Sequence, residues 1–525
     1  MESTQRSFRY LIPSEDIPIK HKTIFINNLS NAVNVIVMAF LSFLMTPFYL
    51  KTLGILLYGI WNIVQSIVTY ASMMDLGVQS AVQKYIAEYL EKNNLDEIHK
   101  TISSALLFYI LVTSLVGITI ICLLWNHLTY FNIGADYISV TRTILILMTV
   151  DLMIVLPGTV WCGVLTGAYL FYVVNFIFVV FNILKAITIY FFMVQGYGIV
   201  SMAVTSLGGD FFQFSLLFGL VQRKYKLFSF KKFTINWTNF RLILSFGIKT
   251  FLIIVSSTIK IRSDSLLVGH YLSPAGIPAY VIPANLVYYA RQMLLSITQS
   301  FLPLFSKLDA GSKDHQIREI ILLYSRYTCL CIFPLVAILF IFGEPFLAIW
   351  VGQEISQNGG IIVSILSLSV FILSLNPLGP LYLIGTAKQQ IIVSAGFVSM
   401  FLFLGSGILL IRPLGTLGIA LAFLLAEACQ TIMIFKKTKE LMNLSLIVFF
   451  RQSLIKPLII LLLITIVFQV LKINYYPRKF WVLSVEIGLG LSVTILFTYL
   501  IGLSQEERKI ICRKYKNLIG KYSIV

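Results

Sequence analysis

Charged residues are scarce in this 525-residue chain, and acidic residues are the scarcest of them. Only 12% of the residues are charged, about half the share in an average soluble protein. In contrast, 58% are hydrophobic, and the mean hydropathy is +0.88. The longest polar stretch between apolar runs covers about residues 79–100, which is too short for a separate soluble core. The composition therefore excludes a soluble domain and predicts a function within a membrane.

Cysteines are also few, and their spacing predicts neither a disulfide nor a metal site. Cys329 and Cys331 would point to different faces of a helix. Most of the others lie within apolar runs, so we interpret all six as packing residues: Cys122, Cys162, Cys329, Cys331, Cys429 and Cys512.

A cleavable signal peptide is not predicted at the N-terminus. Residues 1–22 are polar and charged and lack a small-residue cleavage site. We therefore expect a cytoplasmic tail and a first helix that stays in the mature protein.

Long apolar runs account for most of the chain. Each run of roughly 20 residues is long enough to cross the ~30 Å bilayer core. The sequence thus predicts an all-α membrane protein with about 14 transmembrane helices. The predicted spans are 24–50, 58–76, 103–125, 141–164, 169–194, 199–221, 242–265, 275–305, 319–343, 360–383, 391–411, 418–435, 455–472 and 480–503.

Basic residues gather on one side of the predicted membrane. With 14 spans both termini share a side, and the segments on that side carry the dense basic clusters 6–22, 223–241, 436–456 and 508–521. Because cytoplasmic loops carry the excess of lysine and arginine, we expect both termini in the cytoplasm of a bacterial plasma (inner) membrane. This basic rim faces anionic headgroups and explains most of the net charge of +18 without a nucleic-acid partner.

The two halves of the chain repeat one another at an offset of 217 to 220 residues. The offset relates five pairs of residues: Gly59 and Gly276, Pro157 and Pro377, Gly167 and Gly385, Gly198 and Gly418, and Asp210 and Glu427. Such self-similarity predicts a tandem duplication of a six-helix unit. Because six is even, the two copies are parallel, and two such lobes can expose a central cavity to each side in turn.

The repeat divides the chain into four predicted parts. The cytoplasmic tail and N-lobe occupy residues 1–221, and a basic cytoplasmic linker occupies residues 222–241. The C-lobe covers residues 242–437. Residues 438–525 form a last helix pair and a basic cytoplasmic tail.

Ionisable side chains inside a membrane cost about 2.5 to 3.5 kcal/mol each, so they usually face a cavity or a partner. In span 242–265, Lys249, Ser256, Lys260 and Asp264 share one helical stripe. Such a lining suits an anionic, hydroxyl-rich ligand, because cations match a diphosphate and amides match sugars. Three other spans carry polar stripes, formed by Asn27, Asn31 and Asn34, by Asn175, Asn182 and Lys185, and by Asn285, Tyr288, Arg291, Gln292 and Gln299.

Alternative roles remain open for several of these side chains. Lys260 and Asp264 lie near the outer end of their span, where they could snorkel or pair locally. Lys249 could pair with Asp75 or Asp210 instead of binding a ligand. The asparagines could join helices to one another.

Other intramembrane charges have separate interpretations. Arg291 lies deeper in its span, which favours a cavity role. Asp210 and Glu427 occupy equivalent positions in the two halves and are candidates for coupling to a proton or sodium ion, since each has a glutamine nearby. Helix–helix hydrogen bonding is the alternative for both. Asp151 and Glu486 are interpreted as structural, and no other cofactor is expected.

Seven short segments resemble one family of membrane proteins. They are 46–54 (TPFYLKTLG), 58–61 (YGIW), 75–81 (DLGVQSA), 84–89 (KYIAEY), 264–269 (DSLLVG), 342–346 (FGEPF) and 350–352 (WVG). These segments resemble those of polysaccharide-biosynthesis flippases. That family belongs to the superfamily of multidrug and toxin extrusion proteins, oligosaccharidyl-lipid flippases and the lipid II flippase.

The resemblance covers roughly residues 24–435 and implies two lobes around a cationic cavity that takes a lipid-diphosphate head. The segment 289–291 (YAR), followed by Pro303, resembles a pattern of the lipid II branch in which the arginine lines that cavity. Arg291 is therefore carried over as a substrate-binding residue. The segment 75–77 departs from that branch, so we expect an antigen, capsule or exopolysaccharide repeat unit rather than lipid II. The other predicted substrate-binding residues are Lys185, Lys249, Lys260, Asp264, Asn31, Asn34 and Asp75.

The resemblance implies a flippase and not an enzyme. The expected activity is to move a polyprenyl-diphosphate-linked oligosaccharide from the inner to the outer leaflet by alternating access. The expected partners are this lipid-linked sugar, membrane lipids, a polysaccharide polymerase and a chain-length regulator. Two alternatives remain open. The cavity's positive charge disfavours a multidrug or organic-cation antiporter, and the short outward loops disfavour a membrane polysaccharide polymerase.

Overall fold

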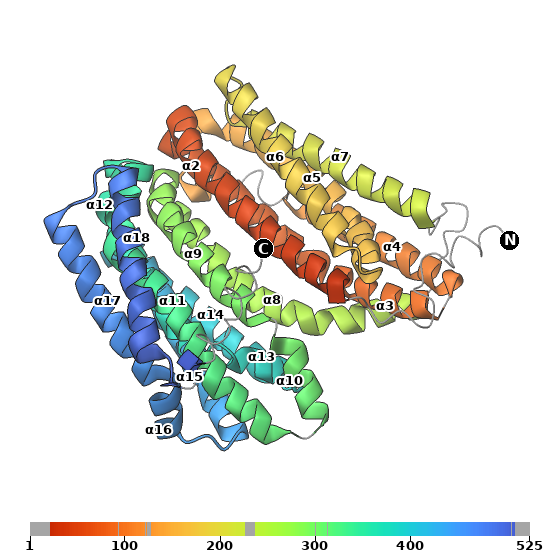
Figure 1. Ribbon diagram of the computed structural model, residues 1–525. Helices are drawn as coiled ribbons and strands as arrows, with labels where there is room; N and C mark the ends of the chain where they lie inside the picture. Colours follow the sequence, from red (N-terminus) through yellow and green to blue (C-terminus); the bar gives the residue numbers. More distant parts are fainter. Residues whose placement is uncertain are drawn as a thin grey trace, which may run out of the picture. The chain divides into compact units, whose positions relative to one another are not determined.

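Helices make up nearly all of the described chain. The computed structural model describes residues 21–92, 94–120, 122, 128–225, 237–299, 301–311, 313–505 and 507–509, and within these ranges it holds no strand (Figure 1). Eleven segments of this described part are long and apolar enough to cross a membrane, and the first of them covers Leu29–Glu91. The prediction of an all-α, multi-pass membrane protein is confirmed.

The chain forms two compact units, Met1–Pro278 and Ala279–Val525. The first contains α2 (His21–Ser72), η1 (Met73–Asp75), α3 (Val78–Glu91), α4 (Leu95–Thr119), η3 (Leu128–Phe131), α5 (Ala135–Gly167), α6 (Phe171–Val194), α7 (Val200–Tyr225), α8 (Trp237–Tyr271) and η5 (Pro274–Gly276). In this unit α8 packs against α2, α3 and α4. The predicted lobe boundary at residue 242 follows the repeat and not the packing, and it stays a prediction. Most of the linker, residues 226–236, and most of the two tails, residues 1–20 and 510–525, lie outside the described residues.

The second unit begins within α9 (Ile277–Gln299). It continues with α10 (Phe301–Ala310), α11 (Asp314–Trp350), α12 (Gln353–Ser374), α13 (Gly379–Gly385), α14 (Gln390–Leu414), α15 (Thr416–Leu441), α16 (Leu446–Phe449), η6 (Phe450–Leu454), α17 (Ile455–Asn474), α18 (Phe480–Phe497) and η7 (Thr498–Gly502).

A glycine separates the first two predicted spans. Gly54 interrupts α2 with φ +76° and ψ 170°, a backbone conformation that glycine adopts without a Cβ clash. The spans 24–50 and 58–76 are thus the two arms of α2. Beyond the break, a Cβ on Gly59 would lie 1.8 Å from the carbonyl oxygen of Pro274. Only a residue without a side chain lets η5 approach α2 so closely.

The stretch expected to be a polar connection, residues 79–100, is largely helical. Its apolar residues recur at helical spacing and form the buried face of α3: Val78, Ala81, Val82, Tyr85 and Ile86. Gly163 of α5 makes room for this face, because a Cβ there would meet Val82 at 2.9 Å. The stretch between the apolar runs, noted in the sequence only as polar, therefore contains an amphipathic helix.

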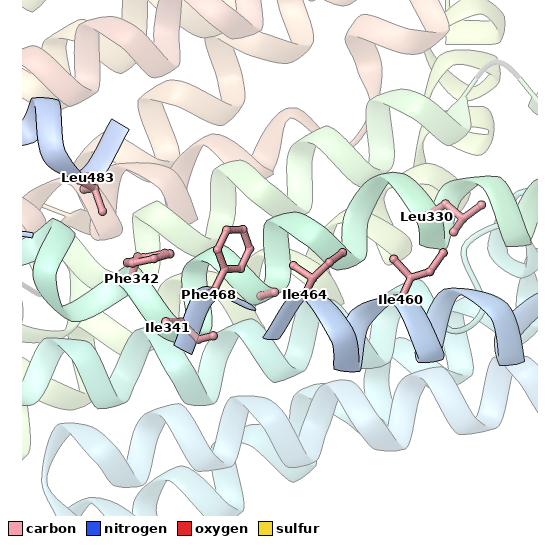
Figure 2. Close-up of a cluster of buried hydrophobic side chains, with 8 residues drawn as sticks. Leu330, Ile341, Phe342, Ile460, Ile464, Phe468 and Leu483 are labelled. Atoms are coloured by element: carbon pink, nitrogen blue, oxygen red, sulfur yellow. The ribbon is translucent and has the colours of Figure 1, made fainter. Parts of the chain in front are cut away.

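The last helix pair is fastened to α11 by an apolar cluster. Figure 2 shows Phe468, Ile464 and Ile460 of α17 beside α11, with Leu483 of α18 near one end. The rings of Phe342 and Phe468 meet edge to face with centroids 5.4 Å apart. A Cβ on Gly490 would lie 1.8 Å from the Phe468 ring, so α18 packs very closely. Within their unit, α17 and α18 are therefore an addition to one side of α11.

A polar cluster attaches the end of the chain to the same helix. The Glu507 carboxylate accepts hydrogen bonds from Arg326 and from the Tyr327 hydroxyl at 2.5 Å. Glu507 and Ser504 also bond each other's backbone N–H groups, at 2.6 and 3.3 Å, as in a helix capping box. Burial raises the pKa of Glu507, but Tyr327, Ser504 and Arg326 together outweigh it and hold that pKa below its usual value.

The cysteines of the described residues differ in exposure, and the interpretation of all six as packing residues stays a prediction. All those in the described residues are free thiols. Cys329 is buried and Cys331 is exposed, as expected for two faces of one helix. Cys512 lies outside the described residues.

Candidate functional site

An ion pair joins α6 to α7 in the first unit. The Nζ of Lys185 on α6 lies 3.0 Å from Oδ1 of Asp210 on α7. Both side chains are more than four-fifths buried. The neighbouring residue, Gly209, makes this approach possible, because a Cβ there would lie 2.5 Å from the methylenes of Lys185. The structure thus joins a residue predicted to bind substrate with a residue predicted to couple transport to an ion.

Another buried carboxylate lies on α5, which packs against both α6 and α7. Asp151, the central residue of α5, is only 5% exposed. Its Oδ1 is buried and has no hydrogen-bond partner in the structure. We had interpreted Asp151 as a structural residue, and that interpretation stays a prediction.

The second unit holds another intramembrane ion pair. Nη1 of Arg291 on α9 lies 3.0 Å from Oε2 of Glu427 on α15, whose side chain is only 1% exposed. Nη1 makes no aligned hydrogen bond, so the contact is an ion pair by distance. Glu427 is therefore held deep in the unit by a cation from a helix more than 130 residues earlier.

Asp210 and Glu427, which the repeat relates, form ion pairs with cations from helices that the repeat does not relate. Asp210 is paired from the adjacent α6, whereas Glu427 is paired from α9. The duplication predicts the two carboxylates but not their partners. The substrate-binding roles of Lys185 and Arg291 and the coupling roles of Asp210 and Glu427 stay predictions.

Asp75, the last residue of η1, is hydrogen-bonded to residues of its own unit. Its carboxylate accepts hydrogen bonds from the Tyr109 hydroxyl and from the backbone N–H of Gly77, at 3.1 Å for the latter. Tyr109 in turn accepts one from Thr159 at 3.1 Å. Leu76 and Gly77 both have positive φ, so the carboxylate fastens a tight turn between η1 and α3. These contacts give Asp75 a local structural role, and its predicted contact with substrate stays a prediction.

The polar stripe of α8 is only partly described. Ser256 and Lys260 are buried, whereas Arg262 is exposed, in agreement with the predicted face. Asp264 accepts hydrogen bonds from the N–H of Ser265 at 2.5 Å and from its hydroxyl at 3.1 Å. The Lys249 side chain lies outside the described residues. Of the three residues in this stripe that are predicted to bind substrate, the structure describes the side chains of Lys260 and Asp264. Their contact with substrate stays a prediction.

The asparagines of the first and fifth spans join α2 to α6. Asn175 donates to Asn31 at 2.5 Å and to Ser30 at 2.9 Å, and it accepts from Asn34 at 3.5 Å. Asn27 bonds the backbone around the start of α6. This ladder is the helix-joining alternative that the sequence left open. Substrate contacts of Asn31 and Asn34 stay predictions.

Metal chemistry has no obvious place in the described part of the chain. No group of three or more histidine, cysteine, aspartate or glutamate side chains within it could hold a metal ion. The charged groups of the site are instead paired cations and carboxylates.

This fold is that of an all-α, multi-pass membrane protein. The chain belongs to the polysaccharide biosynthesis protein family, because the model of that family matches residues 25–309, which is 285 of 525 residues. No curated protein matches the sequence.

Solved structures share the fold at low sequence identity. One is the lipid II flippase MurJ in an inward closed conformation, with a TM-score of 0.70, 15% identity and coverage of 91% of this chain and 98% of that chain. A multidrug resistance MATE family transporter of the MOP superfamily, facing inward, gives a TM-score of 0.64 at 14% identity, covering 83% and 98%. The Vibrio cholerae MATE transporter VcmN, in its bent form, gives 0.56 at 13% identity, covering 84% and 98%. The chain thus belongs to the polysaccharide biosynthesis protein family and shares its fold with solved flippase and transporter structures.

Proposed function

We propose that this protein is a flippase that moves a polyprenyl-diphosphate-linked oligosaccharide from the inner to the outer leaflet of the bacterial plasma membrane by alternating access. The observation that carries the proposal is the combination of a polysaccharide-biosynthesis family match with a flippase-like, multi-pass fold. Polysaccharide repeat units are assembled on lipid carriers, and a charged, sugar-bearing head needs a polar path through hydrocarbon.

Arg291 is the proposed ligand of the diphosphate. A guanidinium can bind phosphate oxygens at two points and stays charged when buried. Glu427 contacts one nitrogen, Nη1, and so orients the planar group within the membrane. A diphosphate can then exchange with the carboxylate or share the cation with it. Within the first unit, Lys260 and Lys185 are further buried cations that we propose contact the anionic substrate, and Lys185 is paired with Asp210.

The prenyl tail has a separate proposed place, along α17 and α18. These helices expose large apolar side chains, among them Leu462, Ile466, Val470, Leu489 and Ile495. Each methylene moved from hydrocarbon to a polar environment costs about 0.8 kcal/mol. A long tail is therefore expected to stay against this lipid-facing surface while the head passes through the protein.

Topology, energy source and partners belong to the same proposal. The basic clusters support cytoplasmic termini. A proton or a sodium ion is the proposed driving ion, with Asp210 and Glu427 as candidate residues. A polysaccharide polymerase and a chain-length regulator are the proposed protein partners, because a translocated repeat unit must then be polymerised.

Surface polysaccharide in cells tests the role of Arg291. Arg291→Ala should abolish polysaccharide export at normal membrane levels of the protein, and Arg291→Lys should restore it partly, because lysine keeps the charge without the two-point geometry. Arg478→Ala is the matched control, since Arg478 is exposed between α17 and α18. Normal polysaccharide in Arg291→Ala would remove Arg291 from the site. Unchanged polysaccharide after gene deletion, together with sensitivity to cationic drugs, would instead support the antiporter alternative.

A further inference from the structure

We propose that the hairpin of α17 and α18 stabilises α11 across Pro345, and that Lys472 supplies the hydrogen bond that this proline removes from the helix. This role is additional to the contact with the prenyl tail proposed above. It does not depend on which substrate the protein moves.

The first observation is a proline inside a continuous helix. The sequence predicts a span that ends at residue 343, but α11 continues through Pro345 to Trp350. Proline has no backbone N–H, so the carbonyl oxygen four residues earlier, on Ile341, loses its helical donor. Ile341 is only 4% exposed. A carbonyl group without a donor is costly in a membrane, so this one needs a hydrogen bond from outside its own helix.

The second observation is the donor. Nζ of Lys472, in the last turn of α17, donates a hydrogen bond to the carbonyl oxygen of Ile341 at 3.0 Å. A bond from a charged donor is stronger than one from a neutral amide. Helix α12 contacts the same stretch of α11 through Gly360 and Val363, and neither residue has a side-chain donor. Lys472 therefore takes the place of the missing amide.

The hairpin contacts α11 on both sides of the proline. Before Pro345, Lys472 bonds the Ile341 carbonyl group. After it, the ring of Phe346 meets the ring of Phe480 on α18 edge to face, with centroids 6.3 Å apart. The apolar cluster of Figure 2 joins both helices of the hairpin to α11 as well. A change of bend at Pro345 would move these contacts relative to one another, so the hairpin resists it.

An ion pair with Glu344 is the competing explanation for the position of Lys472. Oε2 of Glu344 lies 3.4 Å from Nζ, and the Glu344 side chain is 48% exposed. Ion pairs that are open to solvent contribute little to stability. The bond to the buried carbonyl group should therefore account for most of the effect of Lys472.

The contact gives the last helix pair a part in setting the conformation of the second unit. Prolines are the positions at which long helices bend. The hydrogen bond from Lys472 satisfies the free carbonyl group in one bend of α11, and another bend must break or move that bond. The hairpin thus favours one conformation of α11 over others.

A double-mutant cycle tests the proposal in full-length protein, by equilibrium unfolding in mixed micelles of a mild detergent and sodium dodecyl sulfate. Lys472→Met should raise the unfolding equilibrium constant about tenfold or more. Pro345→Ala returns an N–H to the helix, so in that background Lys472→Met should change the constant by about twofold at most. In the matched control background Pro334→Ala, which alters the other proline within α11, Lys472→Met should keep its full effect. Equal effects in the wild-type and Pro345→Ala backgrounds would overturn the proposal.

Two further variants separate the carbonyl bond from charge alone. Lys479→Met removes an exposed lysine near the start of α18 and should change the constant by about twofold at most. Glu344→Gln keeps the bond between Lys472 and the carbonyl group, so it should also have a small effect. A Glu344→Gln variant as unstable as Lys472→Met would assign the stabilisation to the ion pair and overturn the proposal.

Hydrogen exchange in lipid nanodiscs keeps the test decisive without global unfolding. Lys472→Met should make the backbone amides of residues 346–350 exchange about tenfold faster or more, and Pro345→Ala/Lys472→Met should bring them back toward the wild-type rate. Unchanged exchange in Lys472→Met would contradict the proposal. A protein that shows this rescue but moves no fluorescent polyprenyl-diphosphate saccharide in proteoliposomes would refute the flippase function and leave the role of Lys472 standing.

Discussion

Removal of Arg291 should destabilise the second unit through the carboxylate that it leaves behind. Glu427 is 1% exposed and faces Nη1 of Arg291 at 3.0 Å. Arg291→Ala deletes that cation and keeps the buried carboxylate. Loss of one partner of a buried ion pair typically costs up to about 3 to 5 kcal/mol, because the remaining charge loses compensation.

A second substitution separates this stability effect from a functional one. Glu427→Gln removes the charge with little change in shape, so Arg291→Ala/Glu427→Gln should recover most of the lost free energy of unfolding. The assay is equilibrium unfolding in mixed micelles of a mild detergent and sodium dodecyl sulfate. If Arg291 also binds the diphosphate, the double variant should be stable and still export no polysaccharide. A double variant as unstable as Arg291→Ala alone would show that the Glu427 charge is not the cause of the lost stability.

Three further predictions concern packing, helix joining and pH. Gly59→Ala should lower the free energy of unfolding by about 1 to 3 kcal/mol, because the added Cβ would overlap the η5 backbone. At Gly219, no atom lies within 4 Å of an added Cβ. Gly219→Ala should therefore raise the free energy of unfolding by about 0.5 to 1 kcal/mol in the same assay. Asn175→Ala should cost about 1 to 2 kcal/mol, at roughly 0.6 kcal/mol per interhelical bond, and Asn182→Ala almost nothing, since Asn182 bonds only its own helix. The pKa of Glu507 is lower in the folded chain, so its stabilisation of the C-terminal segment holds above the unfolded pKa and disappears as pH falls through the folded pKa. Hydrogen exchange of residues 504–509 should show this release at acidic pH, and Glu507→Gln should lose the pH dependence.

The membrane-spanning segments and the all-α class could be predicted from the sequence, because a bilayer restricts which segments can cross it. A crossing segment must satisfy its own backbone and be apolar for about 20 residues, and both requirements are visible in the order of residues. The arms of α2 on either side of Gly54, and α17 and α18, match the predicted ranges closely. The helix α3 was missed because it is short and half polar, so its apolar face is too narrow to register as a span.

Which charged side chains pair with one another inside the membrane could not be predicted from the sequence. Arg291 and Glu427 are 136 positions apart, and their contact depends on how α9 and α15 pack within the second unit. The same holds for Lys185 and Asp210, whose contact depends on how α6 packs against α7. Periodicity shows on which side of a helix a charge lies. It does not show which helix lies opposite.

Translocation of the head group is the most direct test of the central claim. Full-length protein would be reconstituted into liposomes that carry a fluorescent polyprenyl-diphosphate oligosaccharide in both leaflets, and a membrane-impermeant quencher would be added outside. The account predicts that the protein makes the inner pool accessible to the quencher much faster than liposomes alone do, and that Arg291→Ala abolishes this acceleration while Arg478→Ala keeps it. An inner pool that stays protected in the presence of well-folded wild-type protein would contradict the account.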